Sequence, residues 1–456
     1  MKHLILFLAI ITATACGKKD IVSPPPVTDP VARINQWILD SMKRYYYWGD
    51  GIAAKPVIED PNSFFKSILS VNDRFSWISN GRDLLPPSNS YFTYGFHYAL
   101  VEAAGYPGLI GVVTAVNKGG AADLAGFARG SYFIAVGGVK MTTGNMAAVN
   151  LSLSMSSSVH ITPATYDGTN WTPGAELILF PGYRAENPAQ TVRTFEAGGV
   201  RTGYLYYSSF DEHYDAELLA AINKLRGAGI SELILDLRYN AGGSVATSGK
   251  LAALVAGKLT GNEIYAIYAG NRAEGKKGRS LQEVLNTSGA AAGKQYENLR
   301  PMQLSLNRIF VLTTGGTVSA AELIVNNLKP FLPLIQIGEP TRGKNEAGFL
   351  ITDQRIPPQV AWSLEPTVYK LFNKNNEGNY ENGLIPQYPV AELAALPLTA
   401  MGSSADPLVK KALEIIYGNN IPQDYNILQR GRRLTKVKPL YRSSEDATTN
   451  SLMRVR

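Results

Sequence analysis

Cysteine, histidine and long apolar runs are scarce in this chain of 456 residues, which contains one cysteine and four histidines. A single cysteine, Cys16, cannot form an intramolecular disulfide, and no cluster of cysteine, histidine and carboxylate residues has metal-ligand spacing. No stretch is long enough for a transmembrane helix. The sequence therefore predicts a protein with no disulfide framework, no bound metal and no cofactor.

Charge is also low and widely spread. Charged residues make up 18% of the chain, apolar residues make up 45%, and the net charge is +7. These values are typical of a globular protein and exclude a largely disordered one. One basic cluster stands near the end and comprises Arg430, Arg432, Arg433, Lys436, Lys438 and Arg442. No aromatic platform alternates with it, so we interpret residues 419–456 as a solvated basic tail and not as a nucleic-acid or membrane-surface site.

The N-terminus has the pattern of an export signal. Lys2 and His3 precede an apolar stretch at residues 4–11, and the small residues 12–15 lead to Cys16. This order resembles a bacterial lipoprotein signal peptide over residues 1–16. We therefore expect a lipid on Cys16 and tethering to a membrane of the bacterial cell envelope, with an ordinary secretory signal as the alternative. The proline-rich residues 17–30 would then be a linker.

Residues 31–90 have the apolar spacing of helices. Six aromatic or aliphatic side chains recur at intervals that predict an amphipathic helix, namely Ile34, Trp37, Ile38, Met42, Tyr45 and Trp48. Asp60 and Pro61 have the residue types of an N-cap and a first helical position, so a second helix should begin there. We interpret this part of the chain as a small helical domain.

Residues 91–185 change to short apolar runs separated by glycine, which is typical of β-strands. The sequence predicts strands at 111–116 and 132–136 and a short helix at 121–126. This order resembles a PDZ domain, although the proline and the aspartate of the usual pattern are absent. The resemblance implies a carboxylate-binding loop formed by Tyr94, Gly95 and Phe96, where an extended peptide would add a strand to the sheet. A β-rich spacer domain is the alternative.

From residue 195 to residue 418, predicted strands alternate with predicted helices, which indicates an α/β layer structure. Strands are expected at 204–207, 233–238, 309–312 and 334–337, and helices at 216–225 and 245–259. A further helix should begin after Ser319 and end before Pro330. Residues 261–305 are polar and rich in glycine, so we expect an insertion or a mobile flap there.

Ser319 stands at the start of that last helix. With Glu322 it forms a capping-box pattern, in which the serine only caps the helix. The same place also suits a nucleophile, because a helix N-terminus stabilises developing negative charge and the Ala320 N–H can face an oxyanion. For the serine taken alone, helix capping is the more common role.

Lys344 ends a glycine-containing loop after the 334–337 strand. A solvated surface lysine is the usual case, and a base near neutral pH needs a pKa about three units below the normal value. Burial among apolar neighbours can produce such a shift. If both strands lie in one sheet, Ser319 and Lys344 can meet as a nucleophile and its base. Residues 338–344 also match the start of a phosphate-binding P-loop, but Asn345 replaces the required serine or threonine.

Residues 236–243 read Asp-Leu-Arg-Tyr-Asn-Ala-Gly-Gly. One interpretation is a strand that ends in a glycine turn, with Asp236 and Arg238 as a surface ion pair. In the functional interpretation, backbone N–H groups of Gly242 and Gly243 face a reacting carbonyl, because glycine permits close approach and unusual dihedral angles. These residues alone do not separate the two interpretations.

Together the motifs resemble the C-terminal processing peptidases, also called tail-specific proteases. The matching residues are Asp236, Leu237, Arg238, Asn240, Gly242 and Gly243, then residues 319–322, then Gly343 and Lys344, then the Gly-Leu-Ile-Pro segment at 383–386. The resemblance covers residues 31–418. It implies an α/β peptidase core similar to the ClpP/crotonase fold, preceded by the N-terminal helical domain and the PDZ-like β-rich domain.

The resemblance further implies a serine endopeptidase that cleaves peptide or protein substrates through an acyl-enzyme. The implied roles are Ser319 as nucleophile, Lys344 as general base, Ala320 with Gly242 or Gly243 as oxyanion donors, and Glu322, Arg238 and Asp236 as supporting residues. Many members carry a glutamine four residues after the lysine, where this chain has Gly348, which leaves a Ser–Lys dyad. Of the histidines only His213 lies in this core, so a Ser–His pair is disfavoured. A peptide-binding protein without turnover is the alternative function.

Overall fold

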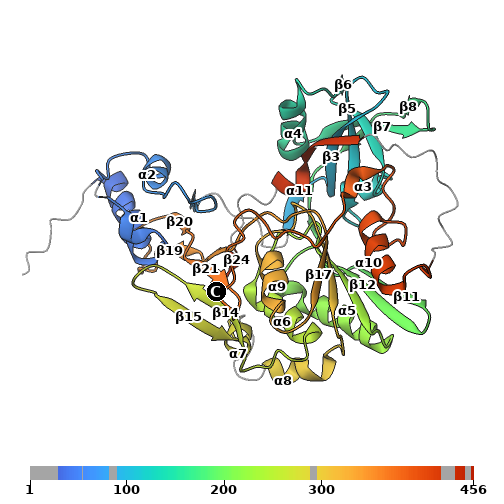
Figure 1. The fold of residues 1–456 in the computed structure, drawn as a ribbon. Helices are drawn as coiled ribbons and strands as arrows, with labels where there is room; N and C mark the ends of the chain where they lie inside the picture. The colour runs from blue at the N-terminus through green and yellow to red at the C-terminus, as the bar shows by residue number, and fades with distance from the viewer. Residues whose placement is uncertain are drawn as a thin grey trace, which may run out of the picture.

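The computed structural model describes residues 29–53, 55–81, 90–287, 295–422, 437–446 and 453–455. Cys16, the predicted signal peptide and most of the predicted linker lie outside these residues. Figure 1 shows an N-terminal helical region, a β-rich domain and a larger α/β core. Within the described ranges, no helix is long and apolar enough to cross a membrane. The same ranges contain no group of three or more His, Cys, Asp or Glu residues that could hold a metal ion.

The N-terminal region contains the two predicted helices, α1 (Pro30–Tyr45) and α2 (Pro61–Ser67), with the short helix η1 (Gly49–Gly51) between them. Asp60 caps α2 by accepting a hydrogen bond from the Ser63 N–H at 2.9 Å. The sequence did not predict strand β1 (Trp77–Asn80), which pairs with β20 (Trp362–Glu365) of the core. Because α1 also packs on the main apolar cluster of the core, the helical region is firmly joined to it.

The β-rich domain is built on a sheet in the order β23-β3-β4-β5-β7-β8. Its elements are β2 (Ser90–Thr93), β3 (Phe96–Ala103), β4 (Leu109–Val116), α3 (Ala121–Leu124), β5 (Tyr132–Val136), β6 (Val139–Lys140), α4 (Met146–Met155), β7 (Val159–Tyr166), β8 (Trp171–Pro173), β9 (Leu177–Leu179) and β10 (Gly182–Ala185). The strands predicted at 111–116 and 132–136 and the helix predicted at 121–126 are present as β4, β5 and α3.

The outer strand of this sheet comes from the far end of the chain. β23 (Val437–Arg442) pairs with β3, α11 (Ser443–Asp446) follows it, and β24 (Met453–Arg454) pairs with a strand of the core. The expectation of a solvated basic tail is therefore wrong for residues 437–446 and 453–455. Charge and composition suggested solvation, but main-chain hydrogen bonding to open strand edges does not depend on side-chain polarity.

The core is a six-stranded sheet in the order β11-β12-β13-β16-β17-β22. Its strands are β11 (Thr191–Ala197), β12 (Val200–Tyr206), β13 (Glu232–Asp236), β16 (Ile309–Thr313), β17 (Leu334–Gly338) and β22 (Tyr388–Pro389), and all but β11 run parallel. Alternate residues of β16 belong to different apolar clusters, so both faces of the sheet are covered. One cluster includes the helices α5 (Asp215–Gly227), α6 (Val245–Val255) and α9 (Ala320–Leu328), and the other includes α10 (Pro407–Tyr417).

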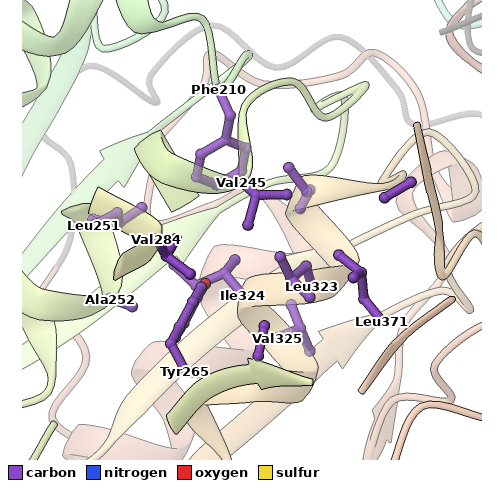
Figure 2. Packing of buried hydrophobic residues seen from close by; sticks show 14 of the residues in the cluster. Phe210, Val245, Leu251, Ala252, Tyr265, Val284, Leu323, Ile324, Val325 and Leu371 are labelled. Atoms are coloured by element: carbon purple, nitrogen blue, oxygen red, sulfur yellow. The ribbon is translucent and has the colours of Figure 1, made fainter. Parts of the chain in front are cut away.

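Residues 261–305 are not a flap over their described part. They form β14 (Ile264–Ala269), β15 (Lys276–Ser280), α7 (Leu281–Leu285), α8 (Gln295–Leu299) and η3 (Arg300–Met302). Figure 2 shows Tyr265 of β14 lying among side chains of α6, α7 and α9, and its hydroxyl is 2.6 Å from Ser248 Oγ. β14 belongs to a second sheet in the order β15-β14-β21-β18-β24, which includes β18 (Glu346–Gly348) and β21 (Tyr369–Phe372).

Candidate active site

Ser319 lies in the turn between β16 and α9, at the carboxyl end of a central parallel strand, where α/β sheets commonly bind ligands. Its backbone has φ 63° and ψ −118°, and only one other non-glycine residue in the described ranges, Asn376, has a positive φ. An ordinary N-cap residue has an extended backbone, so this strained conformation is not that of a simple capping serine. The Ser319 hydroxyl is buried and has no hydrogen-bond partner among the described residues.

The Glu322 carboxylate joins the Ser319 turn to the lysine loop. Ser319 and Glu322 have the capping-box arrangement, and its well-formed half is the bond of 2.9 Å from the Ser319 N–H to Glu322 Oε2. The same oxygen accepts the Lys344 N–H at 2.8 Å. The other oxygen accepts the Gly343 N–H at 2.6 Å and the Thr341 hydroxyl at 2.5 Å. The backbone nitrogens of Ser319 and Lys344 therefore lie within two hydrogen-bond lengths of each other.

Burial shifts the pKa values of Glu322 and Lys344 in opposite directions. Burial raises the pKa of Glu322, and the hydrogen bonds to its carboxylate oppose that rise. The Lys344 side chain is 0% exposed, and burial lowers its pKa to about 8, against the opposing effect of the Glu346, Glu365 and Glu322 carboxylates. A substantial fraction of this amine is therefore neutral at slightly alkaline pH, as a general base requires.

The chain after Lys344 continues as strand β18 and not as a helix. A P-loop places phosphate at a helix N-terminus, so the structure excludes that interpretation of residues 338–344.

Two residues of the N-terminal region contact the lysine loop and were not identified from the sequence. Lys344 Nζ lies 4.3 Å from the centre of the Phe75 ring. Arg74 donates hydrogen bonds to the Gly343 carbonyl and, at 3.2 Å, to the Glu381 carbonyl. Arg74 and Gly343 are 269 positions apart, and no local pattern marks such a contact. The N-terminal region therefore forms part of the site.

Gly242 contacts the Ser319 turn so closely that a side chain would not fit. A Cβ atom at this position would lie 2.6 Å from Ser319 Cβ and 3.0 Å from the Ala320 nitrogen. Its φ of 98° is also unfavourable for other residues. Asn240 fixes this approach, because its Oδ1 accepts the Gly242 N–H at 2.8 Å and its carbonyl accepts the Val318 N–H at 2.9 Å.

The hydrogen bonds of this loop show which of the two predicted glycine N–H groups is available to an oxyanion. Gly242 already donates its N–H to Asn240. Phe210 donates to the Gly242 carbonyl at 2.9 Å and accepts the Ser244 N–H at 2.8 Å, so the Gly243 N–H points away from Phe210. Gly243 is therefore better placed than Gly242 to donate to an oxyanion. Ala320 is the first residue of α9, where an N–H has no partner within the helix.

Comparison with known proteins identifies the family. Residues 201–390 match Peptidase family S41, and residues 33–77 match the Peptidase S41 N-terminal domain. The chain belongs to peptidase family S41. The first match includes Ser319 and Lys344, and the second includes Arg74 and Phe75.

Relatives of this S41 chain are distant. Carboxyl-terminal-processing peptidase 2 of Arabidopsis thaliana, a chloroplastic protein, is 25% identical over 201 residues, which is 44% of this chain and 33% of the relative. Carboxy-terminal processing protease CtpB of Bacillus subtilis (strain 168) is 24% identical over 263 residues, which is 57% of this chain and 48% of the relative. The chain thus spans half or less of the length of these curated relatives.

Solved structures confirm the predicted α/β peptidase fold with its helical N-terminal region. A crystal structure of an S41 protease from Bacteroides fragilis NCTC 9343 covers 87% of this chain and 99% of its own, with a TM-score of 0.67 and 23% identity. The photosystem II D1 C-terminal processing protease covers 80% of this chain and 94% of its own, with a TM-score of 0.50 and 18% identity. At these identities the similarity concerns the fold.

In this S41 chain, Asp236 and Arg238 are fully buried, so of the two interpretations the one with a surface ion pair is wrong. Arg238 forms ion pairs with Asp236 at 2.8 Å, Asp406 at 2.8 Å and Glu392 at 3.1 Å. Arg129 of the β-rich domain joins the same cluster, at 2.8 Å from Glu392 and 3.1 Å from Asp406. The two side chains thus belong to the joint between the β-rich domain and the core.

The backbone beside Arg238 supports the site more directly. The Arg238 carbonyl accepts a hydrogen bond from the Thr314 hydroxyl, and the Leu237 carbonyl accepts one from the Thr317 hydroxyl at 2.8 Å. These bonds hold the loop before Ser319 against the end of β13.

The Gly-Leu-Ile-Pro segment at 383–386 supports the lysine loop of the S41 core. Leu384 donates its N–H to the Thr341 hydroxyl at 2.7 Å and accepts the Thr341 N–H at 3.2 Å. A Cβ atom at Gly383 would lie 2.2 Å from the Thr341 carbonyl oxygen, so only glycine fits. His213 is 59% exposed with its Nδ1 at 2.7 Å from Asp211, a surface setting that gives no support to a Ser–His pair.

Tyr94 and Gly95 lie immediately before β3, and Phe96 is its first residue. Tyr94 is buried, and the Phe96 ring stacks on Phe127 with 6.1 Å between the ring centres. The Gly95 N–H donates to Thr93 Oγ1 at 3.0 Å. The two aromatic side chains therefore pack within the β-rich domain, and β23 covers the edge of β3 next to them.

Proposed function

We propose that the chain is a serine endopeptidase that hydrolyses peptide bonds of peptide or protein substrates through an acyl-enzyme. The observation that carries this proposal is the single Glu322 oxygen that binds the N–H groups of both Ser319 and Lys344. This carboxylate holds a buried serine in a strained turn beside a buried lysine whose pKa is about 8. A nucleophile needs such a turn and such a base, whereas a capping serine needs neither.

In the proposed reaction the neutral Lys344 amine takes the Ser319 proton as the serine oxygen attacks the substrate carbonyl carbon. The N–H groups of Ala320 and Gly243 would stabilise the negative charge on the carbonyl oxygen. The lysine ammonium then gives its proton to the leaving amine, the carbon–nitrogen bond breaks and an acyl-serine remains. Water attacks the acyl carbon with the amine again as base, which releases the new carboxyl end and restores the serine.

A peptide-binding protein without turnover is the second candidate, and one observation favours it. Residue 348 is a glycine in β18, so no side chain at this position can orient the lysine. Phe75 contacts the amine from another direction. An aromatic ring can restrict the amine, but it does not accept a hydrogen bond as a glutamine oxygen does.

The test compares the full chain with its Ser319→Ala and Lys344→Ala variants. We expect the natural protein to cleave casein and to be labelled by a fluorophosphonate at Ser319, as located by peptide mass spectrometry. Each variant should keep its fold and lose at least about 10³-fold in kcat/KM. Lys410→Ala, which changes a lysine that is 55% exposed, is the matched control and should retain full activity.

Cleavage that both variants retain would contradict the proposal. Peptide binding without labelling or cleavage would favour the second candidate.

We also propose that the protein is anchored to the bacterial cell envelope through a lipid on Cys16 and that the β-rich domain is PDZ-like. The pattern of residues 1–16 supports the anchor. Strand β3 begins at the 94–96 loop and pairs along its outer side with another segment, and this arrangement supports selection of substrates partly by their C-terminal segment. Cys16→Ser should move the protein from the membrane fraction to the soluble fraction, and unchanged membrane association would argue against the lipid.

A further inference from the structure

The C-terminal segment, defined here as residues 437–446 and 453–455, pairs with two strand edges of the molecule. Its first part, β23, pairs antiparallel with β3, from Val437 opposite Ala103 to Arg442 opposite Ala99. The chain therefore runs toward the 94–96 loop, at the start of β3. An extended peptide that adds a strand to β3 and brings its C-terminal end to this loop would run in the same direction.

The side chains of β23 are more exposed than those of a core strand, as expected for a bound peptide. None of its six side chains is buried, whereas five of the eight in β3 are. Leu440 and Tyr441 pack on the apolar cluster to which β3 and α4 contribute, and the Tyr441 ring centre is 5.7 Å from that of Tyr98. The pairing shifts register after Pro439, a residue type found at sheet edges. In Figure 1 the red segment that leads into α11 lies beside β3 and α4.

After β23 the segment crosses from the β-rich domain to the core. Ser443 Oγ accepts the Tyr98 N–H at 2.8 Å, which continues the contact with β3. The Arg442 guanidinium binds both carboxylate oxygens of Glu339, with 3.0 Å between Nη2 and Oε1. Glu339 directly follows β17, so Arg442 fastens the segment to the sheet that carries the site.

The next residues contact the loop that leads to the nucleophile. A Cβ atom at Gly315 would lie 2.6 Å from a carboxylate oxygen of Glu445, and one at Gly316 would lie 3.2 Å from Ser444 Oγ. These two glycines stand just before Ser319 in the chain. Helix α11 therefore lies against the β16–α9 turn.

The last described part reaches the strand that follows the lysine. β24 pairs parallel with β18, with Met453 opposite Ala347 and Arg454 opposite Gly348. The Val455 N–H donates to the Gly348 carbonyl at 3.3 Å, and the Val455 side chain is buried. β18 begins two residues after Lys344, so the segment approaches the site from the lysine side as well.

We propose that residues 437–446 and 453–455 occupy the substrate path in cis, as a self-ligand that a protein substrate must displace. The proposal rests on the proposed peptidase function and adds a class of substrate to it. A displacing substrate would be an extended segment with an aliphatic–aromatic pair followed by a basic residue, as in Leu440-Tyr441-Arg442. Because the segment is part of the chain, its effective concentration at β3 is high, and a free peptide binds weakly until the segment is released.

Binding is measured on the full chain with Ser319→Ala, so that no cleavage interferes. The probe is a fluorescein-labelled synthetic peptide with the sequence of residues 437–446. Two variants are designed to release the segment. The double variant, Leu440→Asp with Tyr441→Asp, removes the apolar contact. Val455→Pro removes the N–H that donates to the Gly348 carbonyl. Lys438→Ala is the matched control, since this side chain is 72% exposed and its partner Glu102 is 45% exposed.

We expect the double variant to bind the probe about tenfold more tightly than the Ser319→Ala parent, and the control to bind it as the parent does. With Ser319 restored, the double variant and Val455→Pro should cleave casein faster, and added peptide 437–446 should inhibit the double variant. Hydrogen exchange should show loss of protection over residues 437–442 in the double variant.

Probe affinity and cleavage that stay at the parental level, in variants that keep the melting temperature of the parent, would overturn the proposal and make the segment purely structural. If the proposed peptidase function alone is wrong, cleavage is absent throughout while the gain in probe affinity persists. Val455→Pro leaves β23 unchanged, so it still tests the self-ligand at β18 if the double variant fails to fold.

Discussion

Lys344 and Arg238 are both basic residues with 0% exposure, yet their pKa values shift in opposite directions. Arg238 forms ion pairs with three carboxylates, and these hold its pKa above the usual value despite burial. Lys344 lies against the ring of Phe75, and burial lowers its pKa to about 8. Burial alone therefore does not decide whether a cation is reactive. The carboxylates around each cation also set its pKa, because they favour the charged form against the effect of burial.

The two clusters also differ in what they connect. The cluster around Arg238 joins the β-rich domain to the core, because Arg129 contributes from one side and Asp406 from the other. Burial alone would raise the pKa values of Glu392 and Asp406, but the two guanidiniums hold both below the usual range. The guanidiniums keep Glu392 and Asp406 ionised in the structural joint, whereas burial brings the pKa of the Lys344 amine to about 8, as the proposed general base requires.

Replacing Lys344 by methionine should have the largest effect. We expect kcat/KM for casein to fall by about 10³- to 10⁴-fold, because the proton acceptor is lost. The variant should unfold at higher urea concentration at pH 7, since burial of the ammonium costs about 3 kcal/mol if its pKa falls from 10.5 to about 8. The gain in stability should be complete below pH 8. It should disappear as pH rises toward 10.5, where the Lys344 amine of the natural protein becomes neutral in the unfolded state as well as in the folded state. A less stable variant would contradict this account.

Replacing Arg238 by methionine should have the opposite effect on stability. We expect a loss of about 3–5 kcal/mol in the free energy of unfolding, because the carboxylates of Asp236, Glu392 and Asp406 would remain buried without their cation. Urea unfolding measures the change. Arg355→Met is the matched control, since Arg355 pairs with Asp353 at 2.7 Å but is 45% exposed, and it should cost less than about 1 kcal/mol. Equal losses of stability in both variants would show that the buried ion pairs of Arg238 contribute no more than the exposed pair of Arg355.

Gly242→Ala tests whether the glycine loop sets the position of the serine. The new Cβ would lie 2.6 Å from Ser319 Cβ, so the turn must move, and we expect kcat/KM to fall by about 10²- to 10³-fold. Gly198→Ala is the matched control, because Gly198 has a φ of 58° and open space around it. It should lose some stability and no activity. Normal kinetics in Gly242→Ala would show that the close contact is unimportant.

The smallest expected effect is a shift in the pH profile of activity, which should depend on the residues around the Lys344 amine. Activity of the natural protein should rise with pH through an apparent pKa of about 8, because the neutral amine is the base. Phe75→Leu keeps the site dry but removes the ring face that favours the ammonium, so the apparent pKa should fall by about 0.5 to 1 unit. Phe75→Ala admits water, and the apparent pKa should rise toward 10.5. Identical profiles for all three proteins would mean that Phe75 does not act on Lys344.

Local patterns were enough for much of the fold. The capping residues of α2, the core strands β12, β13, β16 and β17, and the helices α5, α6 and α9 were predicted because their periodicity and end signals are local. The assignments that differ from the structure are those where a strand edge decided the outcome. β15 and β23 carry polar or basic residues and still form strands, because a neighbouring edge offers main-chain hydrogen bonds that composition does not reveal.

The sequence by itself determined the family resemblance, the alternation of strands and helices, and the choice of Ser319 and Lys344 as candidate residues, since these depend on residue types at short spacing. Only the tertiary structure decided that Lys344 is buried against Phe75, that Arg238 belongs to a separate joint, and that β23 and β24 pair with β3 and β18. Burial and charge pairing arise from residues far apart in the chain, and a pKa or a strand edge exists only once those residues meet.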